Sequence, residues 1–210
     1  NRTVRLPPKL FSHNDQQSVW QSSYAEGGVT GWGGNLGDLA LAGNGGNSLF
    51  TCVSVTGNAV FLSGDSALSY QIGAGGATAI APVVGTAYGS AACQAALRTL
   101  VTQPRAHVLE NELNRITARS IDSQTVLSTA LSGSAGKFDS FLPDQVAGAT
   151  VGLNRQLKMV ARLIDAQQSL GLSRQVFMVS MGGFDHHDNL AVGHARLLTI
   201  LGNAMAGFQS

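Results

Sequence analysis

The densest group of side chains that could do chemistry lies near the end of the sequence, in the segment Asp-His-His-Asp at 185–188. It follows a short apolar run and two glycines. Carboxylate oxygens and imidazole nitrogens are ligands that zinc and other divalent cations take from proteins. A carboxylate and an imidazole two residues apart, as in Asp185 and His187, can face one ion when the loop curls. A complete site needs three or four ligands, so others must come from distant sequence. The alternative is a solvated polar loop in which Asp188 caps the last helix.

A second candidate is Ser12, at the start of the segment Ser-His-Asn-Asp at 12–15. The residues that follow it up to Tyr24 contain no helix breaker, which predicts a helix capped by Ser12 or Asn14. Backbone N–H groups and the helix dipole favour an anion at such an N-terminus. A hydroxyl in that place is well positioned to be phosphorylated or acylated. The alternative is that Ser12 only caps the helix.

A third candidate is Ser66, in the segment Gly-Asp-Ser at 64–66 after an apolar run. This segment resembles the nucleophile block of small serine esterases. Those enzymes also carry an Asp-x-x-His pair near the C-terminus, where this chain has Asp188 in place of the histidine. The segment therefore indicates an alternative function, a metal-independent serine esterase using Ser66 with His186 or His187.

The elements that must position these residues can be predicted from the apolar periodicity. Helical spacing predicts a long amphipathic helix over 105–131. Pro104 is predicted to stand at the N-terminus of this helix, and a break near Ser120 is left open. A second amphipathic helix is predicted over 153–164, before Gly171. A final helix is predicted to reach Phe208.

The apolar run 176–181 is typical of a strand buried on both faces in a parallel sheet, and ligands bind beyond the carboxyl ends of such strands. The remaining strands are predicted at 49–55 and 59–62, joined by a turn at 56–58, and at 69–72. The fold class is therefore α/β, with a mostly parallel sheet flanked by helices. The glycines of 30–34 predict a tight turn or a close backbone approach.

Composition excludes several classes of function. The 210 residues include 13 Lys and Arg against 12 Asp and Glu, and charged residues make up 12% where about 25% is usual. No basic cluster offers a footprint for nucleic acid, and no apolar run of about 18 residues predicts a membrane span. The length allows one large domain over residues 1–210 or part of a larger domain. Cys52 and Cys93 lack zinc-site spacing, and a disulfide between them is left open.

Three segments together resemble a known family. They are Leu-Phe-Ser-His-Asn-Asp-Gln-Gln at 10–17 with Trp20, Thr-Gly-Trp-Gly-Gly at 30–34, and Val-Phe-Met-Val-Ser-Met-Gly-Gly-Phe-Asp-His-His at 176–187. The combination is similar to a large bacterial domain-of-unknown-function family, whose members are typically exported by the twin-arginine route. That family is placed in the alkaline phosphatase and sulfatase superfamily. The resemblance spans nearly the whole chain. It implies an alkaline phosphatase-like sheet, with a metal site at the strand ends beside a nucleophile at a helix N-terminus.

Carried over residue by residue, the resemblance puts Ser12 at the nucleophile position. Asp185 and His187 match the first metal-ligand pair, with Asp-His-His here where the family usually has Asp-Thr-His. The function that this resemblance implies is that of a metal-dependent hydrolase, which cleaves small-molecule phosphate, sulfate or related esters with zinc, calcium, magnesium or manganese. Export implies a periplasmic or extracellular protein, and the oligomeric state is left open.

The chain also departs from the family pattern. Family members begin with a strand that ends in Gly-Gly-x-Asp-Gly, and they continue into a Phe-Gly-Arg motif and a Gly-Thr-Asp-His-Gly loop. None of these motifs occurs in this sequence. The resemblance therefore implies the central part of a larger domain, incomplete at both ends and lacking two sources of metal ligands. The alternative function from a different class is a non-catalytic exported binding protein.

Overall fold

The computed structural model describes Leu6 and residues 9–146 and 149–210. These residues form two compact units. One contains the described residues up to Gly75 together with Ser134–Ser210, and the other contains Gly76–Gly133. A compact unit need not fold alone, so one domain over residues 1–210 stays a prediction.

The first unit is built on a small parallel sheet. Its strands are β1 (Cys52–Ser54), β2 (Ser69–Gln71) and β5 (Val176–Met178), in the order β2-β1-β5. Val53 of the central strand is in register with Tyr70 and Phe177. The expected parallel α/β arrangement is therefore confirmed. The last strand is shorter than 176–181, and it is only half-buried, so the expected burial on both faces is wrong.

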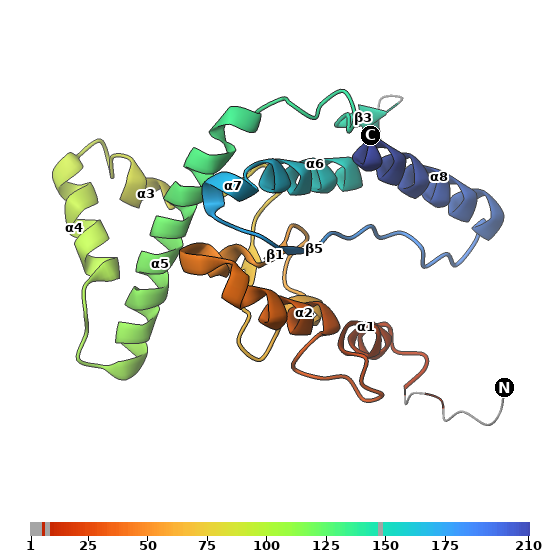
Figure 1. The fold of residues 1–210 in the computed structure, drawn as a ribbon, viewed down its shortest axis with the longest axis horizontal. Coiled ribbons are helices and arrows are strands. Elements are labelled where there is room, and N and C mark those ends of the chain that lie inside the picture. The colour runs from red at the N-terminus through yellow and green to blue at the C-terminus, as the bar shows by residue number, and fades with distance from the viewer. Residues whose placement is uncertain (1–5, 7–8, 147–148) are drawn as a thin grey trace. The chain divides into compact units, whose positions relative to one another are not determined.

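Helices cover this sheet from two sides. Figure 1 shows α1 (His13–Ser22) and α2 (Trp32–Ala40) on one side of β1 and β5, and α6 (Gly152–Asp165) and α8 (Leu190–Gln209) on the other. The short helix α7 (Gln167–Leu170) follows α6 and ends at Gly171, whose φ of 66° is left-handed. The apolar spacing of α6 buries one face of the helix, with Leu153, Met159, Val160 and Leu163 all buried. The sequence predictions of α1, α6 and α8 are confirmed.

The core of this unit lies beside β1 and differs from the predicted hairpin. Val60–Leu62 forms a short 3-10 helix, η3, instead of a strand. Two further 3-10 helices, η1 (Leu41–Gly43) and η2 (Gly45–Phe50), lead into β1. The strand predicted over 59–62 is wrong because the chain must return to the other end of the sheet before a parallel β2 can begin. Phe61 and Leu62 are buried on that return, which gives an apolar run indistinguishable from a strand in sequence.

The glycines of the 30–34 segment allow α2 to lie directly on η3. Gly31 is the N-cap of α2, and its amide donates to the Ser63 carbonyl at 2.8 Å. A Cβ at Gly31 would overlap the backbone of Val60, and one at Gly34 would overlap that of Ser63. The close backbone approach is confirmed, whereas the tight turn is replaced by the start of a helix.

The second unit is helical and contains α3 (Ala81–Val84), α4 (Ala91–Thr102) and α5 (Val108–Leu131). The long helix runs unbroken through Ser120. Pro104 does not begin this helix, because the amide of Arg105 is bound by the Asn111 side chain at 3.0 Å and His107 is the N-cap. Asn114 donates from the same helix to the carbonyls of Leu100 and Gln103, which closes the connection between α4 and α5.

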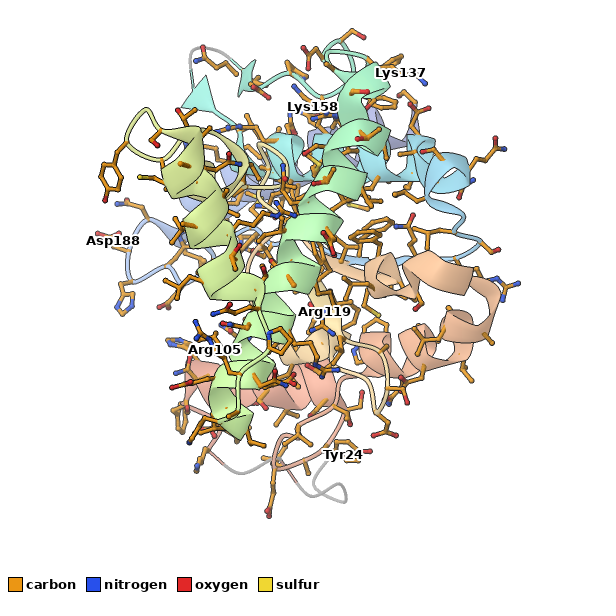
Figure 2. All side chains as sticks on the ribbon, turned by 90° about the vertical axis from the view of Figure 1, so that its left-hand side faces the viewer. Tyr24, Arg105, Arg119, Lys137, Lys158 and Asp188 are labelled. Atoms are coloured by element: carbon orange, nitrogen blue, oxygen red, sulfur yellow. The ribbon has the colours of Figure 1, made fainter. Side chains whose placement is uncertain are left out.

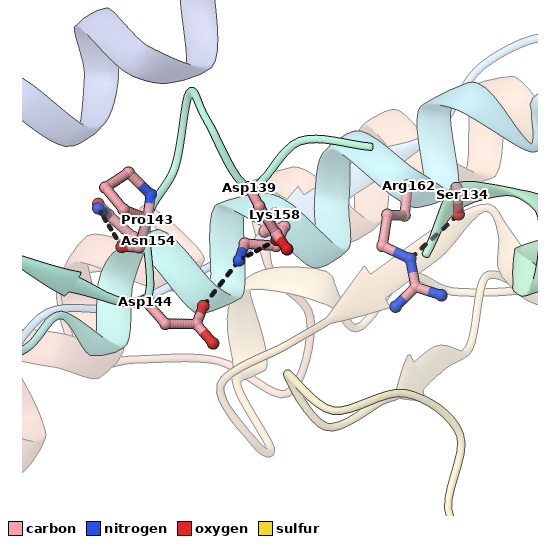
Figure 3. A network of polar contacts seen from close by, with 7 residues as sticks. All are labelled: Ser134, Asp139, Pro143, Asp144, Asn154, Lys158 and Arg162. Atoms are coloured by element: carbon pink, nitrogen blue, oxygen red, sulfur yellow. Dashed lines mark hydrogen bonds and ion pairs between the residues drawn. The ribbon is translucent and has the colours of Figure 1, made fainter. Parts of the chain in front are cut away.

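The 3-10 helix η4 (Ser132–Ser134) follows α5 in the chain, and the first unit continues from Ser134 to a short antiparallel pair, β3 (Gln145–Val146) and β4 (Ala149–Thr150). Figure 3 shows how α6 is fixed to this connection, with Lys158 between two carboxylates. Its Nζ lies 2.5 Å from Asp139 and 2.8 Å from Asp144. Burial alone would lower the pKa of Lys158, but the hydrogen bonds to the two carboxylates outweigh it, and the pKa is raised. The hydrogen bond from Lys158 lowers the pKa of Asp144.

We expect Lys158→Met to lower the free energy of unfolding by about 1 kcal/mol, since exposed pairs contribute about 0–1 kcal/mol each and the methionine keeps the apolar stem. Urea unfolding measures the loss. Because the folded pKa of Asp144 is depressed, its contribution is present above its unfolded pKa of about 3.9 and is lost as pH falls through the folded pKa. The difference between the two proteins should therefore shrink below about pH 4. Lys137→Met, which removes the single exposed pair with Asp165, is the control and should cost less.

Candidate functional site

Ser12 occupies the N-cap of α1, as predicted. Its Oγ accepts a hydrogen bond from the Asp15 amide at 3.3 Å. The hydrogen bond with the Ser12 side chain, followed by the one from Lys9, lowers the pKa of Asp15. An ionised carboxylate therefore lies beside the hydroxyl at the start of the helix. Capping and nucleophilic attack are compatible roles, because accepting an N–H bond leaves the hydroxyl proton free to be transferred.

The structure brings this helix N-terminus to the Asp-His-His loop. Asp185 Oδ2 lies 3.8 Å from His13 Nε2 and 3.4 Å from His187 Nε2. All three side chains are exposed, so a ligand or substrate can reach them. His13 immediately follows Ser12, so the two segments that the sequence singled out lie next to each other. Sequence reasoning had no signal for the role of His13, because its partner lies at the other end of the chain.

The loop after β5 is shaped by two left-handed residues, Gly183 with a φ of 93° and Asn189 with a φ of 48°. Asn189 is the N-cap of α8, so the alternative that Asp188 caps the last helix is wrong. Figure 2 labels Asp188 on the loop that precedes α8, where its side chain is exposed.

The two adjacent histidines of this loop have different environments. The His186 ring lies against Gly193 of α8, where a Cβ would overlap it, and its centroid is 6.2 Å from that of His194. His186 Nε2 is buried and has no hydrogen-bond partner in the part of the chain that the structure describes. The ring of His187 lies beside Asp185 instead. The backbone of the loop thus separates a histidine packed on α8 from one that shares a site with the carboxylate.

The donor set suits a divalent metal in its chemistry. Zinc holds nitrogen and oxygen ligands at about 2.0–2.1 Å in a tetrahedron, so neighbouring donor atoms lie roughly 3.4 Å apart. The separation of 3.4 Å between Asp185 and His187 agrees with this spacing, and that of 3.8 Å to His13 is slightly longer. Over residues 9–146 and 149–210, no group of three or more His, Cys, Asp or Glu side chains is arranged to hold a metal ion. The spacing of Asp185 and His187 therefore fits a pair of ligands, and His13 lies near that pair without completing a three-ligand group.

Ser66 lies on a loop organised by Asp38 of α2. The Asp38 carboxylate accepts hydrogen bonds from three consecutive amides, those of Asp65 at 2.8 Å, Ser66 at 2.9 Å and Ala67 at 2.6 Å. The bonds from these amides, the one from Ala67 first, lower the pKa of Asp38. The Ser66 side chain is exposed, and within the described residues it makes no hydrogen bond to a histidine. The Gly-Asp-Ser segment thus has a structural role that the sequence did not reveal.

The two cysteines are free thiols, so the disulfide left open by the sequence is not formed. Cys52 is buried in β1, and its burial, followed by the charge of Asp38, raises the pKa of the thiol to about 11. A thiol with so high a pKa stays protonated and unreactive at neutral pH.

Fold and site together define an α/β protein with a three-stranded parallel sheet flanked by helices, and with a His-Asp-His cluster beside a helix N-terminus. Comparison of the chain with protein-family models, with curated proteins and with solved structures gives no match in any of the three. None of the described helices is long and apolar enough to cross a membrane.

Proposed function

We propose that the protein is a metal-dependent hydrolase of phosphate, sulfate or related small-molecule esters, with an alkaline phosphatase-like fold. The observation that carries the proposal is the approach of His13 to Asp185 at 3.8 Å. This contact joins the helix that Ser12 caps to the loop that carries Asp185 and His187, which supports a common site for the hydroxyl and the carboxylate-imidazole pair. The resemblance of the same segments to the superfamily pattern supports this assignment.

Each residue then has a defined task. Asp185 and His187 would hold the ion, with His13 as a third donor. The chemistry that such an ion would supply is polarisation of the ester oxygen and stabilisation of the charge that develops on it. Ser12 Oγ would attack the phosphorus or sulfur atom, forming a bond to it while the bond to the alcohol oxygen breaks. The carboxylate of Asp15 would accept the hydroxyl proton, and the departing alkoxide would take a proton from water and leave as the alcohol. The free amides of the first turn of α1 stabilise the transferred anionic group. Water then hydrolyses the serine ester and restores the hydroxyl.

The resemblance extends the proposal to the setting of the protein. We infer that the chain is the central part of an exported domain that acts in the periplasm or outside the cell. The other metal ligands of the full site would come from the segments that supply the family motifs absent from this sequence.

Calorimetric titration with Zn²⁺ and with Mn²⁺ tests the metal pair. We expect Asp185→Ala and His187→Ala to weaken binding at least about tenfold, since each removes one of few ligands. Asp188→Ala is the matched control, because it removes an exposed carboxylate from the same loop, and it should leave the affinity unchanged. Absence of binding by the unaltered protein, or equal loss in all three variants, would contradict the proposal and favour a non-catalytic binding protein.

Assays of 4-nitrophenyl phosphate and 4-nitrophenyl sulfate hydrolysis distinguish the two possible roles of Ser12, nucleophile and helix N-cap. Ser12→Asn retains a strong N-cap but lacks the hydroxyl, and Ser12→Thr retains both. Activity lost in the first variant and kept in the second is the expected result. Activity that survives a chelator and disappears in Ser66→Ala would instead establish a metal-independent serine esterase.

A further inference from the structure

A cleft of about 710 Å³ lies at the carboxyl end of β5, within the first unit. Its walls come from Val146 of β3, the N-terminal turns of α6, the residues just after β5, and the middle of α8. The volume is in the range of small-molecule sites, about 300–1,000 Å³. The position beyond the end of a parallel strand is where α/β proteins bind ligands. The apolar part of the lining consists mainly of five side chains, Val146, Val151, Leu153, Met181 and Ile200.

One charged side chain, Arg196 of α8, lines this otherwise neutral cleft. No hydrogen bond or ion pair of its guanidinium occurs within the residues that the structure describes. A guanidinium presents a planar set of N–H donors that matches phosphate, phosphonate, sulfate and carboxylate oxygens. The cleft therefore combines an apolar surface with one free site for an anion.

The wall of the cleft is fixed before any ligand arrives. The Gln156 side chain of α6 donates to the Ser180 carbonyl at 2.9 Å and accepts from the Ser180 amide at 2.9 Å. The Gln156 side chain therefore satisfies both backbone groups of Ser180, and the two bonds connect the chain just after β5 to α6. A wall held in place loses little conformational entropy on binding, which favours affinity.

We propose that this cleft binds an amphiphilic anion, with the alkyl or aryl group of the ligand against Val151, Leu153 and Ile200 and its anionic head on Arg196. Burial of an alkyl chain contributes about 0.8 kcal/mol for each CH₂ group, and the charge-assisted hydrogen bonds to arginine orient the head. Binding in this cleft requires neither a metal nor Ser12, so the test of this proposal is independent of the hydrolase proposal.

Calorimetric titration of the full chain with octylphosphonate, in the presence of a chelator, tests the site. Methylphosphonate serves as a probe with the same head and no chain. We expect one equivalent of octylphosphonate to bind, and methylphosphonate to bind at least tenfold more weakly. Arg196→Gln should weaken octylphosphonate binding at least tenfold. Arg174→Gln, which removes an equal charge from the segment before β5, should leave it unchanged.

A cavity-filling variant tests the apolar half. Gly152 lines the cleft, and a Cβ there would meet no atom within 4 Å, so Gly152→Leu adds side-chain volume to the lining with no clash at the Cβ. Gly202→Leu makes the same change in open space on α8, outside the cleft. Binding lost in the first variant and kept in the second supports the site. Absence of octylphosphonate binding, equal affinity for both phosphonates, or unchanged binding in Arg196→Gln or Gly152→Leu would each overturn it.

Discussion

Gly34→Ala is expected to lower the free energy of unfolding by at least about 3 kcal/mol or to prevent folding of the first unit. A Cβ at this position would overlap the carbonyl group of Ser63 and the amide of Gly64. These are backbone atoms, and the loop that contains them is held by the bond from the Gly64 amide to the Ala67 carbonyl at 3.0 Å. Overpacking costs about 1–3 kcal/mol where side chains can adjust, and it costs more where the backbone must move.

Urea unfolding followed by circular dichroism measures this loss. Gly202→Ala is the matched control, because Gly202 lies inside α8 in open space. Alanine is favoured over glycine in a helix by roughly 0.8–1.0 kcal/mol, so the control should gain stability. A Gly34→Ala protein as stable as the unaltered one would show that α2 does not lie against the Ser63 backbone.

Asp38→Ala is expected to cost about 2–3 kcal/mol. The substitution removes the acceptor of three backbone N–H groups, and a hydrogen bond to a charged group contributes about 1.5–3 kcal/mol. Water can bind the exposed amides in the variant and replace part of the lost hydrogen bonding. The expected loss of stability is therefore smaller than the sum of three hydrogen bonds. Asp38→Asn retains one carbonyl oxygen in nearly the same shape and should cost less. Asp65→Ala, which removes an exposed carboxylate from the same loop, should be close to neutral.

The contribution of Asp38 depends on pH in a defined direction. Its folded pKa is depressed, so the stabilisation is complete above the unfolded pKa of about 3.9 and is lost as pH falls through the folded pKa. The stability difference between the unaltered protein and Asp38→Ala should therefore be constant near neutrality and shrink below about pH 4. A difference that stays constant down to pH 2 would show that the carboxylate does not hold the loop.

Local signals predicted those parts of the fold in which short-range chemistry decides the structure. Ser12 caps α1, as predicted, because a serine oxygen can bind the free amides of a first turn. The long helix α5 agrees with its apolar periodicity. The parallel setting of β5 agrees with an apolar run between two helices. The predicted start of α5 was wrong because the Asn111 side chain, from the first turn of that helix, binds the amide of Arg105 and leaves His107 as the N-cap.

Residue types and spacing were enough to predict an α/β chain with a hydroxyl at a helix N-terminus and an Asp-His-His loop after a strand. They left open which side chains lie together, because contacts such as His13 with Asp185, or Asp38 with the 65–67 amides, leave no periodicity in the sequence. The folded chain was needed to show that Phe61 and Leu62 belong to a 3-10 helix, that His13 lies beside Asp185, and that a cleft lies next to Arg196. Helices and turns are set by neighbours along the chain, whereas a site is set by packing between segments far apart in it.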